Sequence, residues 1–245
     1  MPKTTNPMAK RSGASTNIIL TAIVLVVAVA VIGGVMIFGG GNQTDEASSN
    51  KVAPSVLHPQ GSHQVVEAGQ GAPTLVEFVD YQCPACHNFY QNVTSELEKE
   101  YEGKINFVVR NNPLDMHPLA VPAAKAAEAA AMQDEFQPMY HKLFDNYSSW
   151  ATPANSSSGV SNDEQRAQRQ FTKFAEQIGL NTEQFREDMN SDKVQQRVDQ
   201  GLSDGQKAGV TSTPTFFLDG EKVQFSQGGA PLQQLRDKID GALAK

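Results

Sequence analysis

The chain contains two cysteines, and they stand three positions apart in the stretch DYQCPACHNF, Asp80 to Phe89. TLVEFVD, Thr74 to Asp80, comes directly before them, and its β-branched and aromatic residues are typical of a buried strand. Apolar side chains then recur at helical spacing, at Phe89, Val93, Leu97 and Tyr101. The cysteine pair is therefore predicted to lie where a strand ends and a helix begins.

This position favours thiol chemistry at the first cysteine. The first turn of a helix has unpaired backbone N–H groups and the positive end of the helix dipole, so Cys83 is expected to ionise readily and to act as a nucleophile. Pro84 suits the first helical position, because its missing N–H would have no partner there. One helical turn brings Cys86 back within bonding distance, and Cys86 is expected to resolve mixed disulfides formed at Cys83.

Three other interpretations of the pair are possible. A structural disulfide across so short a loop would remove only about 2 kcal/mol of unfolded-state entropy, against about 3 kcal/mol for a fifteen-residue loop. A structural zinc site would need two further ligands, and His117 and His141 show no paired ligand spacing. Cys83, Cys86 and His87 also match the Cys-x-x-Cys-His attachment site of a c-type haem, which stays open as an alternative.

The first residues of the chain predict export with a membrane anchor. Lys3, Lys10 and Arg11 precede an uncharged run from Ile18 to Phe38. Such a run can cross a hydrocarbon layer of roughly 30 Å as a helix, whereas a cleavable signal needs only about 7 to 15 apolar residues. Because basic flanks stay in the cytoplasm, we expect a cytoplasmic tail at residues 1–17, a single transmembrane anchor at 18–38 and an extracytoplasmic remainder. A cleaved signal peptide, the alternative, would export the same part.

Residues 39–70 are predicted to form a flexible linker, because Gly, Pro and polar residues leave no apolar periodicity there. Two histidines fall within it, His58 and His63, and neither is assigned a role. The net charge of the chain is −7, which disfavours a nucleic-acid-binding surface.

The strand followed by CPAC resembles the thioredoxin superfamily, and within it the DsbA-like thiol-disulfide oxidoreductases of the bacterial cell envelope, including membrane-anchored members. Glu77 stands six residues before Cys83, where the resemblance implies a buried carboxylate that relays protons to and from Cys86. GVTSTPTFFLDG, Gly209 to Gly220, resembles the cis-proline loop of these proteins, which lies against the active-site cysteines. Pro214 would then follow a cis peptide bond.

The resemblance also implies where a substrate binds. A cis X-Pro bond turns the chain sharply and leaves the preceding backbone free to pair with an extended substrate. The implied substrate-binding residues are Thr213 and Pro214 in this loop, and Pro84 and Ala85 between the cysteines.

The predicted fold class is α/β, a thioredoxin fold with an inserted helical domain. Residues 71–112 and 206–245 make the thioredoxin-like part, and residues 113–205 the helical insertion. The C-terminal part is expected to contain a hairpin that turns at Asp219-Gly220 and a closing helix that begins at Pro231.

Within the insertion, the alanine-rich stretch VPAAKAAEAAAM, Val121 to Met132, is rich in the best helix former and is expected to continue past Glu135. SNDE, Ser161 to Glu164, has the form of a capping box at the start of a later helix. The stretch between them, Ala151 to Val160, is predicted to be a loop.

By resemblance, the chain would be a protein thiol-disulfide oxidoreductase that passes a Cys83–Cys86 disulfide to reduced exported proteins, with no bound cofactor or metal. A quinone-linked membrane partner of the DsbB or VKOR type would restore that disulfide. The alternatives are an extracytoplasmic disulfide reductase of the same fold and a c-type haem protein that uses Cys83, Cys86 and His87.

The dipeptide between the cysteines predicts the strength of the oxidant. Strongly oxidising DsbA-like proteins have Pro-His there, whereas this chain has Pro84-Ala85. An imidazole can donate to a thiolate or attract it, and alanine can do neither, so the reduced form gains less stability. Equilibration with glutathione should therefore give a reduction potential below the value of about −120 mV known for DsbA. An equal or higher potential would contradict this prediction.

Overall fold

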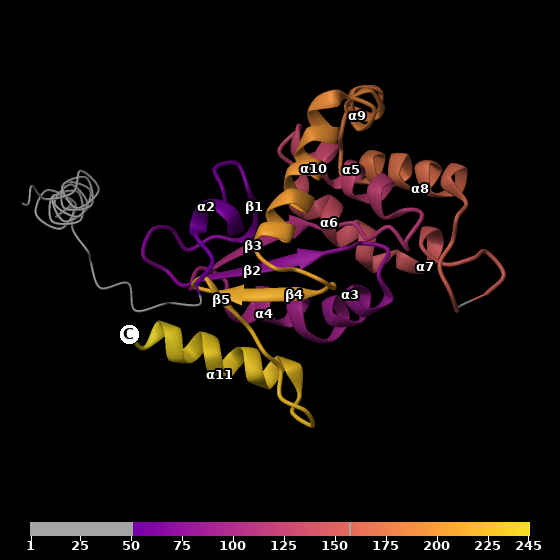
Figure 1. Ribbon diagram of the computed structural model, residues 1–245. Coiled ribbons are helices and arrows are strands. Elements are labelled where there is room, and N and C mark those ends of the chain that lie inside the picture. Colours follow the sequence, from indigo (N-terminus) through magenta and orange to yellow (C-terminus); the bar gives the residue numbers. More distant parts are fainter. Residues whose placement is uncertain (1–50, 157) are drawn as a thin grey trace, which may run out of the picture. The chain divides into compact units, whose positions relative to one another are not determined.

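The computed structural model describes residues 51–156 and 158–245 (Figure 1). The predicted cytoplasmic tail (1–17), the predicted anchor (18–38) and the first part of the predicted linker lie outside these residues. Within the described ranges, every helix is too short or too polar to span a membrane.

A five-stranded sheet lies at the centre of the described structure, in the order β1-β3-β2-β4-β5 (Figure 1). Its strands are β1 (His63–Val66), β2 (Thr74–Val79), β3 (Asn106–Asn111), β4 (Thr215–Leu218) and β5 (Glu221–Lys222). β2 and β3 run parallel, whereas the other neighbouring pairs are antiparallel. Because β2 is the central strand, the residues that follow it leave the sheet near its middle.

Helices cover both faces of this sheet. The connection from β2 to β3 is formed by α3 (Pro84–Phe89), the π-helical turn η1 (Tyr90–Thr94) and α4 (Ser95–Glu100). Apolar residues of this connection and of α11 (Pro231–Leu243) belong to the larger hydrophobic core. α2 (Pro54–Leu57) packs in a smaller core on the opposite face.

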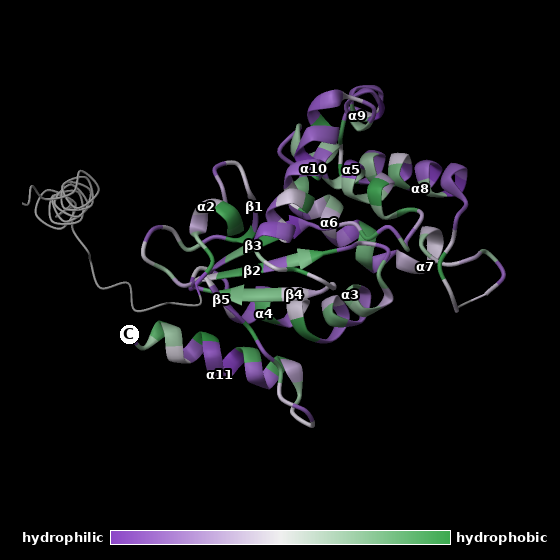
Figure 2. Ribbon diagram, viewed as in Figure 1, coloured by the Kyte–Doolittle hydropathy of each residue, from purple (hydrophilic) through white to green (hydrophobic). Residues whose placement is uncertain are grey.

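The connection from β3 to β4, described at residues 112–156 and 158–214, contains six helices that pack on one another beside the sheet (Figure 1). They are α5 (Ala120–Ala131), α6 (Phe136–Asp145), α7 (Tyr147–Trp150), α8 (Glu164–Gln177), α9 (Thr182–Met189) and α10 (Asp192–Lys207). In Figure 2 the outward sides of α8, α9 and α10 are hydrophilic, while the central strands are hydrophobic. These helices form the helical insertion that the fold class predicted, and the last of them, α10, ends at Lys207.

The alternation of side chains along β2 separates the two cores. Leu75 and Val79 belong to the larger core, and Val76 and Phe78 to the smaller one. Since successive strand residues point to opposite faces, Glu77 faces the larger core, on the side of the sheet where α3 lies.

The predicted linker is wrong from Lys51 onward, because this part of the chain forms α2 and β1. Leu57, Val65 and Val66 are buried, and Arg110 of β3 donates a hydrogen bond to the carbonyl oxygen of Leu57 at 2.7 Å. A single helical turn and an edge strand need few apolar side chains, because hydrogen bonds to other parts of the chain stabilise them. The polar composition of α2 and β1 is therefore similar to that of a flexible linker.

His63 was assigned no role as part of the linker, but it connects β1 to the insertion. Its Nε2 lies 2.9 Å from Oε2 of Glu128 in α5. Its ring stacks on Phe136 of α6, with 4.0 Å between the ring centroids. The histidine is thus a packed, hydrogen-bonded part of the domain.

Two local predictions in the insertion are also wrong. α8 is capped by Asp163, whose Oδ1 accepts a hydrogen bond from the N–H of Arg166 at 2.9 Å, so Ser161 is not the first residue of a capping box. The alanine-rich helix ends at Ala131, and Asp134, with a left-handed φ of 62°, separates α5 from α6. An aspartate tolerates this conformation better than most residues, which allows the chain to turn there.

The C-terminal predictions are confirmed. Asp219 and Gly220 have φ angles of 48° and 89°, as a tight hairpin turn between β4 and β5 requires. α11 begins at Pro231, as expected for a proline in the first helical turn.

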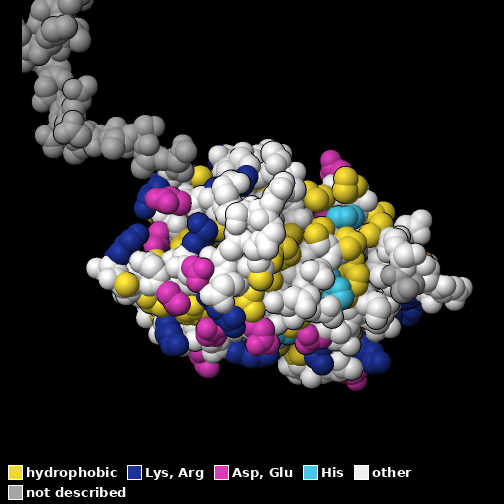
Figure 3. Space-filling model, turned by 90° about the horizontal axis from the view of Figure 1, so that it is seen from below, with side chains coloured by type: hydrophobic (Ala, Val, Ile, Leu, Met, Phe, Trp, Pro, Cys, Tyr) yellow, Lys and Arg dark blue, Asp and Glu magenta, His cyan; other side chains and the backbone are white. Residues whose placement is uncertain are grey.

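Charged side chains of both signs are interspersed on the face shown in Figure 3, mostly over one half of it. Hydrophobic side chains form a broken band across the middle of the same face. Lys and Arg therefore do not form on this face the continuous basic stripe that follows a nucleic-acid backbone.

A glycine in α10 predicts a measurable packing constraint. A Cβ at Gly201 would lie 2.4 Å from the carbonyl oxygen of Asn111 in β3. Gly201→Ala should therefore lower the free energy of unfolding by roughly 1 to 3 kcal/mol, although alanine is the better helix former. Gly241→Ala in α11 is the control, because its Cβ would meet open space, and it should raise stability by about 0.5 to 1 kcal/mol. Urea titration measures the free energy of unfolding of each variant. If both substitutions raised it, the close approach of Gly201 to the Asn111 carbonyl oxygen would be contradicted.

Candidate active site

Cys83 precedes α3 as its N-cap residue, with Pro84 in the first helical turn. Cys86 follows one turn later, and both cysteines are free thiols. Cys83 keeps 7% of its surface exposed and is followed by the exposed Pro84 and Ala85, whereas Cys86 keeps only 1%. Another protein's sulfur atom can therefore reach Cys83 more easily than Cys86.

The pKa of the Cys83 thiol is lowered to about 5. The largest cause is a hydrogen bond from the Cys86 side chain, and burial opposes it. The backbone N–H groups of Cys86 and Ala85, at the start of α3, lower the pKa further. The helix-end donors were predicted from the sequence, but the strongest donor, the second thiol, was not.

Cys86 shifts in the opposite direction. Burial raises its pKa well above the usual value, and the hydrogen bond and negative charge of Cys83 raise it further. At neutral pH the two cysteines therefore share one proton, with a thiolate at Cys83 and a thiol at Cys86. This is the arrangement that a nucleophile and a resolving cysteine need.

Glu77 lies in the central strand with 2% of its surface exposed. Its Oε2 has no hydrogen-bond partner, and burial raises the pKa of its carboxyl group well above the usual value, with the charge of Glu98 adding to the shift. Glu77 also raises the pKa of Cys86, so the two groups interact electrostatically. The resemblance implied a buried carboxyl group that interacts with the second cysteine, and Glu77 has both properties.

The peptide bond between Thr213 and Pro214 is cis, as the resemblance implied. The carbonyl oxygen of Thr213 lies 3.6 Å from Sγ of Cys83, so the loop before β4 packs directly against the nucleophile. Thr213 is buried and Pro214 is partly exposed. The structure thus brings Cys83, Cys86, Thr213 and Pro214 together at one end of the sheet.

Asp80 and His117 form a buried pair beside this site, and the residue pattern did not predict that they would meet. Nδ1 of His117 lies 2.5 Å from Oδ2 of Asp80, which also accepts a hydrogen bond from the N–H of Leu114 at 3.0 Å. Burial raises the pKa of Asp80, and these hydrogen bonds oppose the shift. The pair holds the loop after β3 against the turn that leads to Cys83.

Gln82, directly before the nucleophile, connects the same turn to the insertion. Its Nε2 donates to the carbonyl oxygens of Ala151 and Ser161 at 3.1 and 2.7 Å, and its Oε1 accepts from the N–H of Leu119 at 2.6 Å. Tyr147 donates to the carbonyl oxygen of Gln82 at 2.6 Å. No sequence signal marked these residues, because their partners are far apart in the chain.

The geometry disfavours the haem interpretation. The Cys86 sulfur is buried and hydrogen-bonded to Cys83, and the His87 ring stacks on Tyr147 with 4.2 Å between the ring centroids. A thioether bond at Cys86 would require its sulfur to leave this buried position. Over residues 51–156 and 158–245, no group of three or more His, Cys, Asp or Glu side chains is arranged so that it could hold a metal ion.

The lowered pKa of Cys83 makes a direct prediction. The alkylation rate of the reduced protein, followed against pH, should show a midpoint near 5 for Cys83. Because the pKa is lower in the folded than in the unfolded state, the thiolate stabilises the reduced form fully above the unfolded pKa, and this stabilisation is lost as the pH falls through about 5. A midpoint near about 8.5, the value of a free cysteine, would contradict the described geometry.

Comparison with known proteins agrees with this geometry. A family model described as Thioredoxin matches residues 68–238. A thioredoxin-like oxidoreductase from Silicibacter pomeroyi is 25% identical, with a TM-score of 0.60 over 79% of this chain and 99% of that one. Oxidised BdbD from Bacillus subtilis is 20% identical and shows the same fold, with a TM-score of 0.61 over 80% of this chain and 97% of that one.

One curated relative is the Na(+)/H(+) antiporter NhaA 1 of Mycolicibacterium gilvum, which is 30% identical over 172 residues. The match covers 68% of this chain and 24% of the antiporter, so the chain spans about a quarter of the length of the curated relatives it matches. The family match covers both the cysteine pair and the cis-proline loop. The chain therefore belongs to the thioredoxin family, and its inserted helical domain gives it the architecture of the DsbA-like thiol-disulfide oxidoreductases.

Proposed function

We propose that this protein introduces disulfides into exported proteins by passing on a disulfide formed between Cys83 and Cys86. The observation that carries the proposal is a pair of free thiols at the start of α3, with Cys83 beside the exposed Pro84 and Ala85 and Cys86 buried one turn behind it. The pKa of Cys83 is lowered to about 5 and that of Cys86 is raised, in agreement with this arrangement. A thiol with a low pKa is a good leaving group, so Cys83 is released easily once a substrate has been oxidised.

The reaction begins from the oxidised pair. A substrate thiolate attacks Sγ of Cys83, the bond between Cys83 and Cys86 breaks, and Cys86 leaves with the electron pair and takes up a proton. A second substrate thiolate then attacks the substrate sulfur of the mixed disulfide and releases Cys83 as a thiolate. The substrate has lost two electrons, and the cysteine pair has gained them.

Glu77 is the proton donor that the proposal assigns to Cys86. Its carboxyl group is buried beside Cys86 with a raised pKa, so it holds a proton under conditions in which an ordinary glutamate has lost it. In the reverse direction its carboxylate takes the proton that Cys86 must lose before it can attack a mixed disulfide.

Substrate binding is assigned to the surface around Cys83. An extended segment of the substrate would pair with the backbone at Thr213, beside the cis bond to Pro214. Pro84 and Ala85 are exposed next to the nucleophile and would contact the same segment. The short distance between the Thr213 carbonyl and Cys83 supports this arrangement, because the paired strand would lie over the reacting sulfur.

We further propose that a single helix at residues 18–38 tethers the protein to the cell membrane with the cysteine pair outside the cytoplasm. The uncharged run behind a basic flank supports the tether. A quinone-linked membrane protein of the DsbB or VKOR type would reoxidise the pair. We assign no ion transport to this chain, because it matches only about a quarter of the antiporter relatives.

Two substitutions test the proposed reaction. Cys83→Ser should abolish oxidative refolding of a reduced substrate protein, because the attacked sulfur is gone. Cys86→Ala should accumulate mixed disulfides between Cys83 and substrates in cells, because Cys86 can no longer attack them and only a second substrate thiol can release Cys83. Full oxidase activity of the Cys83→Ser protein would contradict the proposal. Alkylation trapping in intact cells adds the direction of electron flow, and a pair that is reduced at rest would indicate a reductase.

A further inference from the structure

Buried polar side chains from β2, η1, α4 and α6 gather around Glu77. Three of their oxygen atoms have no hydrogen-bond partner within the described protein: Oε2 of Glu77, Oη of Tyr81 and Oε1 of Glu98. Two further hydroxyl groups, of Thr94 and Tyr140, are buried beside them and interact with each other. Each such atom costs about 1 to 3 kcal/mol when it is left unpaired, so a native protein retains a group of them only where they serve a purpose or contact internal water.

These side chains form one electrostatic neighbourhood. Burial is the main reason that the pKa values of Glu77, Tyr140 and Tyr81 are raised. The charge of Glu98 adds to the shifts of Glu77 and Tyr140, and Glu77 adds to that of Tyr140. The charges of Glu128, Glu77 and Cys86 add to the shift of Tyr81, whose ring lies 6.3 Å from that of Tyr140. The group therefore extends from the second cysteine, past the central strand, to α4 and α6.

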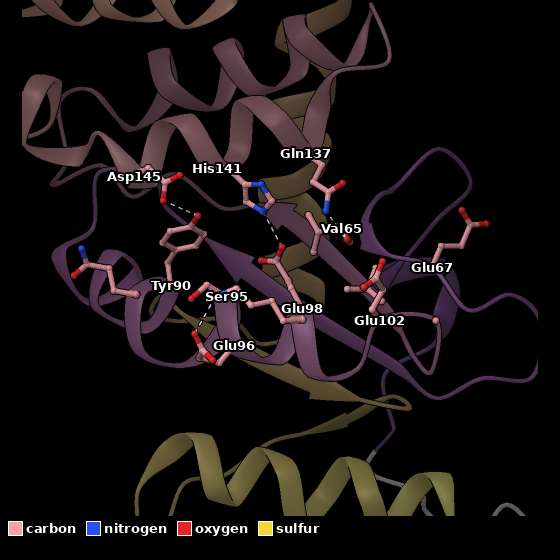
Figure 4. Close-up of a pocket in the computed structure, with 14 residues that line it drawn as sticks. Val65, Glu67, Tyr90, Ser95, Glu96, Glu98, Glu102, Gln137, His141 and Asp145 are labelled. Carbon is pink, nitrogen blue, oxygen red and sulfur yellow. Dashed lines mark hydrogen bonds and ion pairs between the residues drawn. The ribbon is translucent and has the colours of Figure 1, made fainter. Parts of the chain in front are cut away.

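Glu98 is the member of this group that reaches solvent. Its Oε2 lies 2.7 Å from Nε2 of His141, and the His141 side chain is 35% exposed. Both residues line a groove of about 870 Å³ between α4, α6 and the end of β1 (Figure 4). Oε2 of Glu98 thus contacts His141 at the groove, whereas Oε1 is buried and has no hydrogen-bond partner.

Figure 4 also shows the other charged groups around this pair. Tyr90 donates to Asp145 at 2.8 Å on one side of His141. The remaining titratable side chains that line the groove are Glu67, Glu96, Lys99 and Glu102. The groove is predominantly acidic, and such a surface raises the local concentration of protons and of protonated buffer.

The reaction needs a route of this kind. Cys86 exchanges a proton in each half-reaction, yet it is 1% exposed, and a substrate bound to Cys83 covers the nearest surface. Glu77 can take or give that proton but is itself 2% exposed and cannot exchange it with bulk water directly. The residues that line the acidic groove do not include Pro84, Ala85 or Thr213, to which substrate binding is assigned.

We propose that Glu98 and His141 form the solvent end of a proton relay that serves Cys86 through Glu77, with the buried hydroxyl groups of the cluster and internal water bridging the carboxyl groups. The inference rests on the proposed disulfide chemistry of Cys83 and Cys86. When Cys86 attacks a mixed disulfide, its proton passes to Glu77, then to Glu98, and leaves through His141. When Cys86 is the leaving group, the proton moves inward along the same path.

To test this proposal, the reduced protein is mixed with oxidised glutathione, and the rates of the two steps of its oxidation are measured separately. In the first step the Cys83 thiolate attacks glutathione disulfide, releases one glutathione thiolate and forms a mixed disulfide. In the second step Cys86 loses its proton, attacks Cys83 and displaces the second glutathione. Rapid quenching with acid, followed by mass spectrometry, gives both rates from pH 5 to pH 9, a range of about four units that spans the ordinary pKa values of His and Cys.

Glu98→Gln should slow the second step at least about 10-fold, since a positioned proton-transfer group contributes on the order of 100-fold or more, and should leave the first step unchanged. Glu96→Gln is the matched control, because Glu96 lies on the same helix and in the same groove but is exposed and paired with Lys99. It should leave both steps within about 2-fold of the wild type. His141→Ala should slow the second step, and added imidazole should restore it by entering the groove.

The outcomes are distinguishable. An unchanged second step in Glu98→Gln at every pH, with normal capture of glutathione, would overturn the relay and leave the proposed function intact. Slow capture by wild-type Cys83 would instead contradict the proposed function. A second step that is slow in His141→Ala and insensitive to imidazole would show a merely structural effect and would also count against the relay.

Discussion

The hydrogen bond from the Cys86 thiol to Cys83, at the start of α3, is the interaction on which the rest of the site depends. Together with the N–H groups of Ala85 and Cys86 it holds a negative charge on a sulfur atom that is otherwise nearly buried. Without these donors burial would raise the pKa of Cys83, as it does for Cys86. The same bond gives the two cysteines different roles, because the donor keeps the proton that the acceptor has lost.

The fold serves to place this pair. β2 lies at the centre of the sheet and delivers Cys83 to the edge where the cis bond before Pro214 brings the Thr213 carbonyl to 3.6 Å from the sulfur. The turn between β2 and α3 is held from the insertion side by Gln82 and by the buried Asp80–His117 pair. The helical insertion is therefore attached to the nucleophile's own turn through directional hydrogen bonds as well as by apolar packing.

The sequence predicted what depends on local patterns. The buried strand before Cys83, the hairpin at Asp219-Gly220 and the helix from Pro231 all follow from residue type and spacing. The cis bond and the buried Glu77 came from the family resemblance, because spacing alone shows neither a peptide isomer nor burial. α2 and β1 were missed, since their order depends on partners such as Arg110 about fifty residues away. The groups around Glu77 were missed for the same reason: Glu98 and His141 become neighbours only when α4 packs beside α6.

A cysteine pair with a stabilised Cys83 thiolate favours its reduced form, whereas a structural bridge favours its oxidised form. The most direct measurement is the free energy of unfolding of the oxidised and reduced proteins, compared by urea titration at neutral pH. Stabilisation of the Cys83 thiolate in the folded state predicts that the reduced protein is the more stable of the two. A more stable oxidised protein, as a structural disulfide would produce, would contradict it.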